Sequence, residues 1–142
     1  MDEEKEAERT VIGLPPVKVP AALAREGALT GQDLEVMEKL TEGNALLIAV
    51  SGFSQNVRYL LDEPSVSVGR SMKADILLDD PTVSRRHALF TKVGGAYVLK
   101  DLDSLNGTYV NGARIDSLEL HSGDSIMIGR FKMLFYLKDR QS

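Results

Sequence analysis

The sequence predicts an all-β protein: an antiparallel β-sandwich of about eleven strands, preceded by an acidic segment that has no β pattern. Two observations support this prediction. After Gly43 the chain divides into many short β-patterned runs, each bounded by glycine, proline, asparagine or aspartate, with no helical period between them. Before Gly43 lie Pro15, Pro16 and Pro20 and few groups that could build a core.

The boundary is expected near residue 43, with an N-terminal tail over residues 1–43 and one domain over residues 44–142. The tail holds 10 acidic and 5 basic side chains, a net charge of −5, whereas the domain holds 11 and 12, a net charge of +1. Leu34, Met37 and Leu40 recur at helical spacing, which predicts a short amphipathic helix over residues 30–41. A helix of that length either docks on a surface or frays, and the rest of the tail is expected to be mostly disordered.

Four strands are expected in the first half of the domain. Residues 45–50 are a continuous apolar run, which suits a buried strand, and residues 56–62 alternate in polarity. Residues 66–68 form a short apolar run that stops at Gly69. Residues 76–78 follow a turn, and an Asp-Asp-Pro sequence breaks the chain after them.

The second half of the domain contains two hairpin signals. Residues 87–93 alternate in polarity and continue as residues 96–100 across a Gly-Gly turn. Residues 108–110 precede Asn111-Gly112, a second hairpin turn. The remaining expected strands are residues 118–120, 125–128 and 131–137. The loops at one end of such a sandwich are the expected binding surface.

Composition excludes other classes of function. The chain has no cysteine and has two histidines 34 positions apart, so neither a disulfide nor a metal site is expected, and no cofactor motif occurs. The net charge of −4 disfavours a nucleic-acid partner. No apolar run is long enough to cross a bilayer, and the acidic start of the sequence does not resemble a secretory leader, so a cytoplasmic location without a membrane partner is expected.

Three motifs fall at breaks between strands and combine hydrogen-bond donors with positive charge. They are Gly69-Arg70, Ser84-Arg85-Arg86-His87 and Ser104-Leu105-Asn106-Gly107-Thr108. Arginine offers a planar fork of donors that matches phosphate or carboxylate oxygens, and a serine hydroxyl can rotate to donate to the same anion. Together the motifs predict an anion site, although Arg70 alone could equally be a surface residue paired with Asp75 or Asp79.

His87 is open to more than one interpretation. His87 either fixes the loop through its ring nitrogens or contacts the ligand directly. A triad of Ser84, His87 and Asp101 or Asp103 would need a nucleophile elbow, which is absent, so the chain is not expected to be an enzyme. Nucleotide binding is not expected either, because no Gly-x-x-x-x-Gly-Lys loop occurs. Gly107 fits a tight turn that requires positive φ.

The ordered set of Gly69-Arg70, Ser84-Arg85-Arg86-His87 and Asn106-Gly107-Thr108, followed by Asn111-Gly112, resembles the motif set of forkhead-associated (FHA) domains. The resemblance covers about residues 44 to 138. It implies a sandwich of about eleven strands whose loops at one end bind phosphothreonine peptides.

The resemblance also implies a role for each motif residue. Arg70 and Ser84 would contact the phosphate, Arg85 would add charge, and Asn106 would hold the peptide backbone. Many family members carry Thr or Ser where this chain has Leu105, so a hydroxyl contact is either missing or supplied by Ser104. The residues expected to build the loops are Gly69, His87, Gly107 and Thr108.

The tail contains one candidate modification site, Thr10, which follows acidic residues and precedes apolar β-branched ones. This segment is similar to small bacterial FHA proteins in which a serine/threonine kinase phosphorylates the tail, and the tail then closes the binding site of its own domain. Two alternatives remain: a plain solvated linker, or a docking segment in which Leu34, Met37 and Leu40 pack on the sandwich or on a partner.

The expected function is therefore a phosphothreonine-reading signalling module that acts downstream of serine/threonine kinases. Its partners would be phosphothreonine proteins, a kinase or the substrates of that kinase, and its own tail. The alternative is an adaptor or oligomerisation module that binds proteins independently of phosphate.

Overall fold

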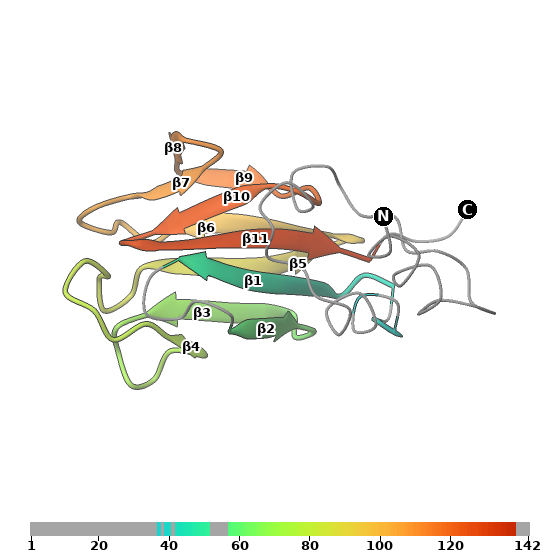
Figure 1. Cartoon of the computed structure of the whole chain (residues 1–142), viewed down its shortest axis with the longest axis horizontal. Helices are drawn as coiled ribbons and strands as arrows, with labels where there is room; N and C mark the ends of the chain where they lie inside the picture. The colour runs from blue at the N-terminus through green and yellow to red at the C-terminus, as the bar shows by residue number, and fades with distance from the viewer. Residues whose placement is uncertain (1–36, 38, 41, 52–56, 139–142) are drawn as a thin grey trace, which may run out of the picture.

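In the computed structural model, which describes residues 37, 39, 40, 42–51 and 57–138, two β-sheets pack face to face (Figure 1). The predicted fold class is confirmed, with eleven strands among the described residues. In chain order they are β1 Ala45–Ser51, β2 Arg58–Leu61, β3 Ser65–Gly69, β4 Ile76–Leu77, β5 Ala88–Val93, β6 Ala96–Asp101, β7 Thr108–Val110, β8 Ala113–Ile115, β9 Ser117–Glu119, β10 Ser125–Ile128 and β11 Phe131–Leu137.

The strands divide into a six-stranded sheet in the order β2-β1-β11-β10-β7-β8 and a five-stranded sheet in the order β4-β3-β5-β6-β9. The predicted antiparallel sandwich has one exception among its strand pairs, since β4 runs parallel to β3 with Val68 opposite Ile76. The physical reason is the loop over residues 70–75, which carries the chain back beside β3 before β4 begins. The Leu78 N–H then donates to the Gly69 carbonyl at 2.9 Å and holds the pair together.

Turn chemistry confirms both predicted hairpins. Asn111 and Gly112 have φ values of 53° and 86°, the left-handed pair that a two-residue hairpin turn needs. This turn joins β7 to β8. Strand β8 was not predicted from the sequence, because its residues are mostly exposed and show no β pattern of their own. Gly94, with φ of 62°, turns β5 into β6.

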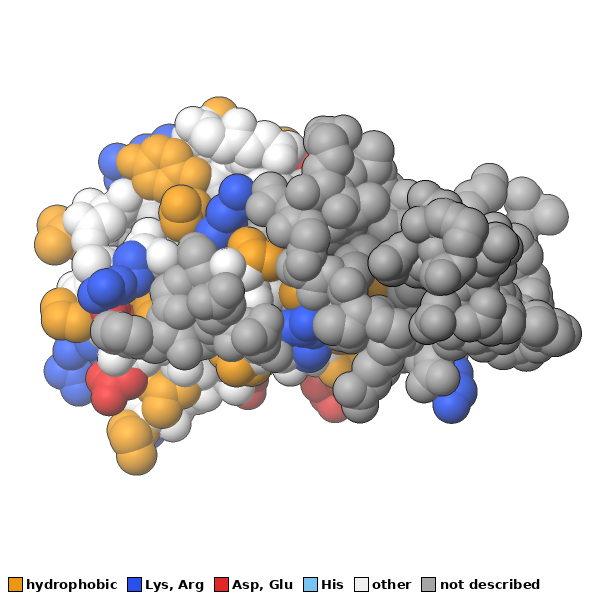
Figure 2. Space-filling model, viewed as in Figure 1, with side chains coloured by type: hydrophobic (Ala, Val, Ile, Leu, Met, Phe, Trp, Pro, Cys, Tyr) orange, Lys and Arg blue, Asp and Glu red, His pale blue; other side chains and the backbone are white. Residues whose placement is uncertain are grey.

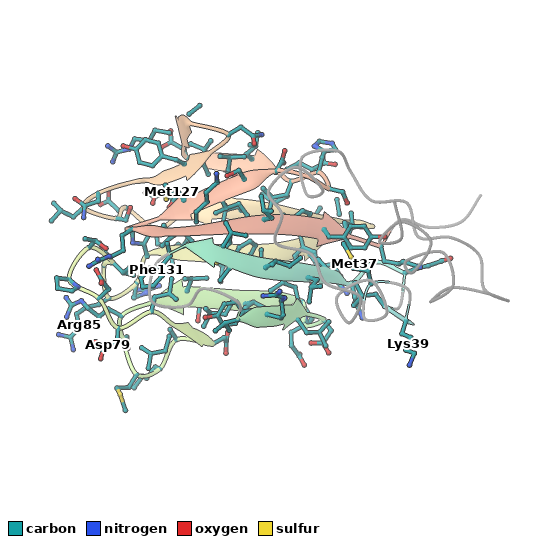
Figure 3. The ribbon with its side chains drawn as sticks, in the orientation of Figure 1. Met37, Lys39, Asp79, Arg85, Met127 and Phe131 are labelled. Atoms are coloured by element: carbon teal, nitrogen blue, oxygen red, sulfur yellow. The ribbon has the colours of Figure 1, made fainter. Side chains whose placement is uncertain are left out.

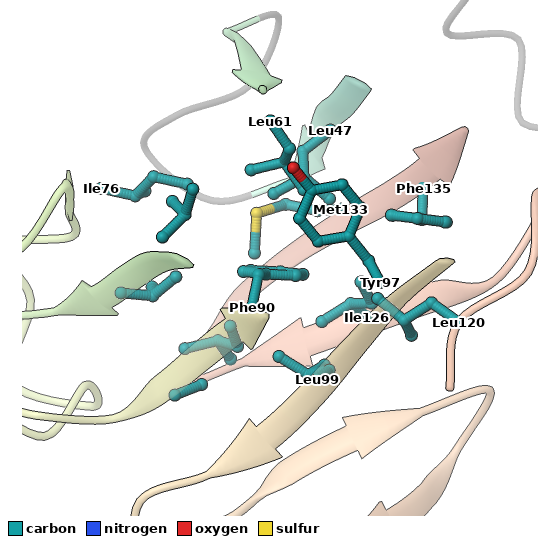
Figure 4. Close-up of a cluster of buried hydrophobic side chains, with 14 of the residues drawn as sticks. Leu47, Leu61, Ile76, Phe90, Tyr97, Leu99, Leu120, Ile126, Met133 and Phe135 are labelled. Atoms are coloured by element: carbon teal, nitrogen blue, oxygen red, sulfur yellow. The ribbon is translucent and has the colours of Figure 1, made fainter. Parts of the chain in front are cut away.

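The main core lies between the two sheets (Figure 4). Alternate residues of the five-stranded sheet point inward, so Phe90 and Leu99, which lie opposite each other, are fully buried. Leu89, next to Phe90 on β5, is only half-buried. Tyr97 and Phe135, from opposite sheets, meet edge to face with ring centroids 6.5 Å apart. The apolar residues that β1 and β11 turn inward complete this core.

A second apolar cluster covers the outer face of the six-stranded sheet. Leu46 and Ile48 of β1 and Leu134 and Tyr136 of β11 are buried there beneath Met37, which has no exposed surface. This cover explains why β1 is a continuous apolar run, since both of its faces are buried. Leu40 packs against the same cluster.

The predicted helix over residues 30–41 is helical at Met37 and Lys39, while most of its length, including Leu34, lies outside the described residues. The docking alternative for this segment is confirmed for Met37 and Leu40, which contact the sandwich. The domain boundary at residue 43 stays a prediction. Within the part of the chain that the structure describes, no helix has the length and apolar character needed to cross a membrane.

Gly69, at the end of β3, is required because another backbone segment approaches it closely. A Cβ atom at this position would lie 2.0 Å from the carbonyl oxygen of Arg85. The two chains approach closely because the Arg70 N–H donates to the Ser84 carbonyl at 2.9 Å and the Ser71 N–H donates to the Arg85 carbonyl at 3.2 Å. Only glycine allows these two loops to touch.

Replacing Met37 with alanine should lower the free energy of unfolding by about 2 kcal/mol or more, because a fully buried side chain is lost from the outer cluster. Met72→Ala is the matched control, since its side chain is 88% exposed and its loss should cost less than about 0.5 kcal/mol. Urea unfolding of both variants measures the difference. Equal midpoints would show that Met37 contributes no packing energy.

Replacing Gly69 with alanine should destabilise the domain by about 1–3 kcal/mol, because the added methyl group must push the backbone at Arg85 away. Gly95→Ala is the control: no atom lies within 4 Å of its added Cβ and its φ is not positive. Thermal unfolding should separate the two variants. If both behave alike, the close approach at Gly69 is not a constraint.

Candidate functional site

Three loops meet at one end of the sandwich, and they carry the predicted motifs. They connect β3 to β4, β4 to β5 and β6 to β7. Figure 3 shows Arg85 and Asp79 at this end of the molecule, with Met37 and Lys39 at the other. We call this end the apical site and define it by Arg70, Ser84, Arg85 and Asn106.

His87 joins two of the loops from beneath. Its ring is fully buried, its Nδ1 accepts the Ser84 N–H at 3.0 Å, and its Nε2 lies 2.9 Å from the Gly107 carbonyl oxygen. An N–H can only donate and a carbonyl can only accept, so the ring is neutral with its proton on Nε2. Both nitrogens are thus occupied within the protein, which supports the loop-building interpretation over ligand contact or catalysis.

Asp101 organises the loop between β6 and β7. Its carboxylate accepts the Ser104 hydroxyl at 2.5 Å, the Ser104 N–H at 3.1 Å and the Thr108 hydroxyl at 2.7 Å. Burial acts to raise the pKa of Asp101, but the hydrogen bonds from Ser104 and Thr108 outweigh it and hold this pKa below its ordinary value. The turn closes at Gly107, whose φ of 88° matches the predicted positive value.

Ser104, predicted as a substitute hydroxyl for the ligand, has a different setting. It is buried, its hydroxyl donates to Asp101, and its oxygen accepts the Gly107 N–H at 2.9 Å. The neighbouring residue Leu105, by contrast with the buried Ser104, has a side chain that is 85% exposed. This geometry favours a loop-building role for Ser104, beside Gly107 and Thr108.

Arg70 and Ser84 keep donors available for a ligand. The Arg70 Nε donates to the Val83 carbonyl at 3.0 Å, which fixes the guanidinium while its two terminal nitrogens have no partner among the described residues. The Ser84 oxygen accepts the Leu105 N–H at 3.0 Å, so its own proton remains to be donated.

The alternative that pairs Arg70 with Asp75 or Asp79 finds no support among the described residues. Asp75 instead accepts the Ser67 N–H at 2.9 Å. Arg70 therefore keeps its charge exposed at the rim, where an anion can reach it.

Asn106 and Arg85 complete the predicted set. The Asn106 Nδ2 donates to the Thr82 carbonyl at 3.0 Å, which fixes the side chain and leaves its Oδ1 as an acceptor for a peptide N–H. The Arg85 side chain is exposed. The structure thus brings Arg70, Ser84, Arg85 and Asn106 to one rim.

Sequence reasoning missed Asp80, which anchors the loop between β4 and β5. Its Oδ1 accepts both the Thr82 hydroxyl at 2.6 Å and the Thr82 N–H at 2.9 Å, and these bonds lower its pKa below the ordinary value with help from Arg130. The Arg130 Nη1 lies 3.4 Å from Asp80 Oδ2, and the backbone N–H of Arg130 donates to the Thr82 hydroxyl at 3.1 Å. The Asp-Pro-Thr sequence was a signal for this capped turn.

Arg114 of β8 was also missed. Its Nε lies 2.8 Å from where a Cβ of Gly107 would stand, so the guanidinium covers the Asn106-Gly107 turn. The predicted Asn111-Gly112 hairpin could have located it, because the turn sets Arg114 opposite Tyr109.

The apical site presents exposed positive charge, because the side chains of Arg70 and Arg85 are exposed. Figure 2 shows Lys and Arg side chains, with an Asp or Glu side chain beside them, at the end of the molecule where Figure 3 places Arg85 and Asp79. Among the described residues no group of three or more His, Cys, Asp or Glu side chains could hold a metal ion. The chemistry available at the rim is therefore anion binding through fixed donors.

Comparison with known proteins gives one consistent family. The family model for the FHA domain matches residues 66–129. The glycogen accumulation regulator GarA of Mycolicibacterium smegmatis is 47% identical over 116 residues, which cover 82% of this chain and 70% of GarA. An oxoglutarate dehydrogenase inhibitor of Corynebacterium jeikeium is 48% identical over 99 residues, 70% of this chain and 69% of the inhibitor.

Solved structures agree. An FHA domain from a study of phosphothreonine-dependent FHA interactions superposes with a TM-score of 0.61 at 34% identity, covering 66% of this chain and 96% of that one. EmbR of Mycobacterium tuberculosis, solved with a low-affinity phosphopeptide, gives a TM-score of 0.62 at 32% identity, covering 70% of this chain and 26% of EmbR. The two relatives of this chain described above are named a regulator and an inhibitor, not enzymes. The chain belongs to the FHA domain family and is homologous to the small FHA regulators of actinobacteria.

Proposed function

We propose that this chain is a regulator that binds phosphothreonine in partner proteins through the apical site. The observation that carries the proposal is the pair of Arg70 and Ser84, which the 2.9 Å bond between their backbones holds side by side with donors unused. Arg70 and Ser84 contact the phosphate and Arg85 adds charge. Asn106 accepts a peptide N–H, and Ser104 supports the turn from below.

The charges fit this ligand. A phosphothreonine carries about −1.5 to −2 charges and three acceptor oxygens, which a fixed guanidinium, a hydroxyl and a second arginine complement. Each charge-assisted hydrogen bond contributes about 1.5–3 kcal/mol, so a few of them give reversible recognition. Because the donors are already fixed by bonds to Val83 and Leu105, little ordering is needed on binding.

Titration with phosphothreonine, threonine and glutamate versions of one peptide tests the proposal, with calorimetry as the readout. Only the phosphorylated peptide should bind. Arg70→Ala and Ser84→Ala should each weaken binding at least about thirtyfold, while the free energy of unfolding changes by less than about 1 kcal/mol. Lys39→Ala is the charge-matched control at the opposite end of the molecule.

Equal binding of all three peptides would contradict the proposal and favour the alternative, an adaptor that is independent of phosphate. Retained binding in Arg70→Ala would show that the guanidinium is not a phosphate ligand.

We also propose that the regulator acts downstream of a serine/threonine kinase and that its own tail is one ligand. Thr10 lies outside the described residues, and the support is the acidic and apolar sequence around it. The kinase or its substrates are the proposed partners in trans. Since corynebacterial relatives are named inhibitors of oxoglutarate dehydrogenase, a metabolic enzyme of that kind is a candidate target.

Incubating the full chain with a bacterial threonine kinase should place a phosphate group on Thr10. Mass spectrometry can locate this phosphate. The modified chain should then bind the phosphothreonine peptide about tenfold or more weakly, because a tethered ligand competes at high effective concentration. Thr10→Ala, treated in the same way, should bind as the untreated chain does. An unmodified Thr10, or modification without weaker binding, would support the plain linker.

A further inference from the structure

A pocket of about 370 Å³ lies beside the apical site, on the outer face of the five-stranded sheet. Ser67 and Leu89, opposite each other on β3 and β5, turn away from the main core and help to line it. The loop between β3 and β4 forms another wall. The volume falls within the range of about 300–1,000 Å³ that is usual for ligand sites.

The lining has two parts with different chemistry. The half-buried side chains of Leu89, Leu102 and Ala74 give apolar surface. Lys73, Arg85 and Arg86 also line the pocket, and their side chains are exposed. Among the described residues, no carboxylate forms an ion pair with any of these three cations. A ligand with a short aliphatic stem and a carboxylate complements this lining.

The pocket is continuous with the apical site. Arg85 belongs to both, and the Ser71 N–H binds the Arg85 carbonyl at 3.2 Å, so the wall of the pocket and the phosphate loop are tied together. A peptide held at Arg70 and Ser84 by one residue can therefore place a neighbouring side chain in the pocket. The second contact depends on the first, so the inference rests on the proposed function.

We infer that this pocket is a specificity subsite for an acidic residue, glutamate above all, flanking the phosphothreonine in the partner peptide. The glutamate methylene groups pack on Leu89 and Leu102, and the carboxylate meets Lys73 and Arg86. Lys73 and Arg86 thereby determine which phosphothreonine sequences the domain prefers. Arg85 remains with the phosphate.

The test uses the full chain with Thr10→Ala, so that its tail cannot carry phosphate there, and a phosphothreonine peptide with alanine flanks. Glutamate is placed at each flanking position in turn. At one or two positions it should tighten binding about five- to tenfold, the gain expected from two solvent-exposed ion pairs.

Lys73→Glu and Arg86→Glu should each remove this preference, while the alanine-flanked phosphopeptide binds within about twofold of its original affinity after correction for the long-range charge change given by Lys39→Glu. Lysine placed at the same peptide position should restore tight binding to the reversed variants. Aspartate should gain less than glutamate, because its stem is shorter.

Glutamate that brings no gain at any position, or a gain that survives both reversals, would overturn the subsite and leave the proposed function intact. An equal loss of all phosphopeptides in Lys73→Glu and Arg86→Glu, beyond the loss in Lys39→Glu, would also overturn it. Failure of the alanine-flanked phosphopeptide to bind better than its unphosphorylated form would overturn the proposed function itself, and the subsite with it.

Discussion

The apical site depends on one buried imidazole. His87 accepts the Ser84 N–H and donates to the Gly107 carbonyl, so a single ring sets the distance between the loop that carries Ser84 and the turn that carries Asn106. Its backbone also takes part, because its N–H donates to Val68 and its carbonyl accepts the Leu102 N–H. A protein interior makes an unpaired polar group costly, so both loops are held in one arrangement before any ligand arrives.

Two carboxylates share this work without facing the ligand. Asp80 fixes the loop before Ser84 and Asp101 fixes the turn after it, and each accepts bonds from a threonine hydroxyl and from a backbone N–H. These two negative charges thus lie behind the loops, and the side chains of Arg70 and Arg85 are exposed at the rim. An anion-binding surface results from a chain whose net charge is negative.

Much of the fold could be predicted from the sequence, because alternation and turn residues report burial and backbone conformation directly. The strand runs and the Asn111-Gly112 turn are of this kind. The parallel pairing of β4, the choice among the alternatives for the segment around Met37 and the reason for Gly69 could not, since each depends on which distant backbone or side chain lies nearby. The same limit explains Ser104: a hydroxyl next to a predicted site turns inward because Asp101 is there to accept it.

The pairing of β1 with β11 has a consequence for how the protein is made. The first described strand lies in the sheet between β2 and the last, so β1 has a partner on one side only until β11 has left the ribosome. Contacts between such distant segments form slowly and leave apolar strand surface open in the meantime. The turn before β11 also brings Arg130 to Asp80. The loop behind Ser84 therefore gains its last support only when synthesis of the domain is almost complete, and a nascent chain cannot present the finished rim early.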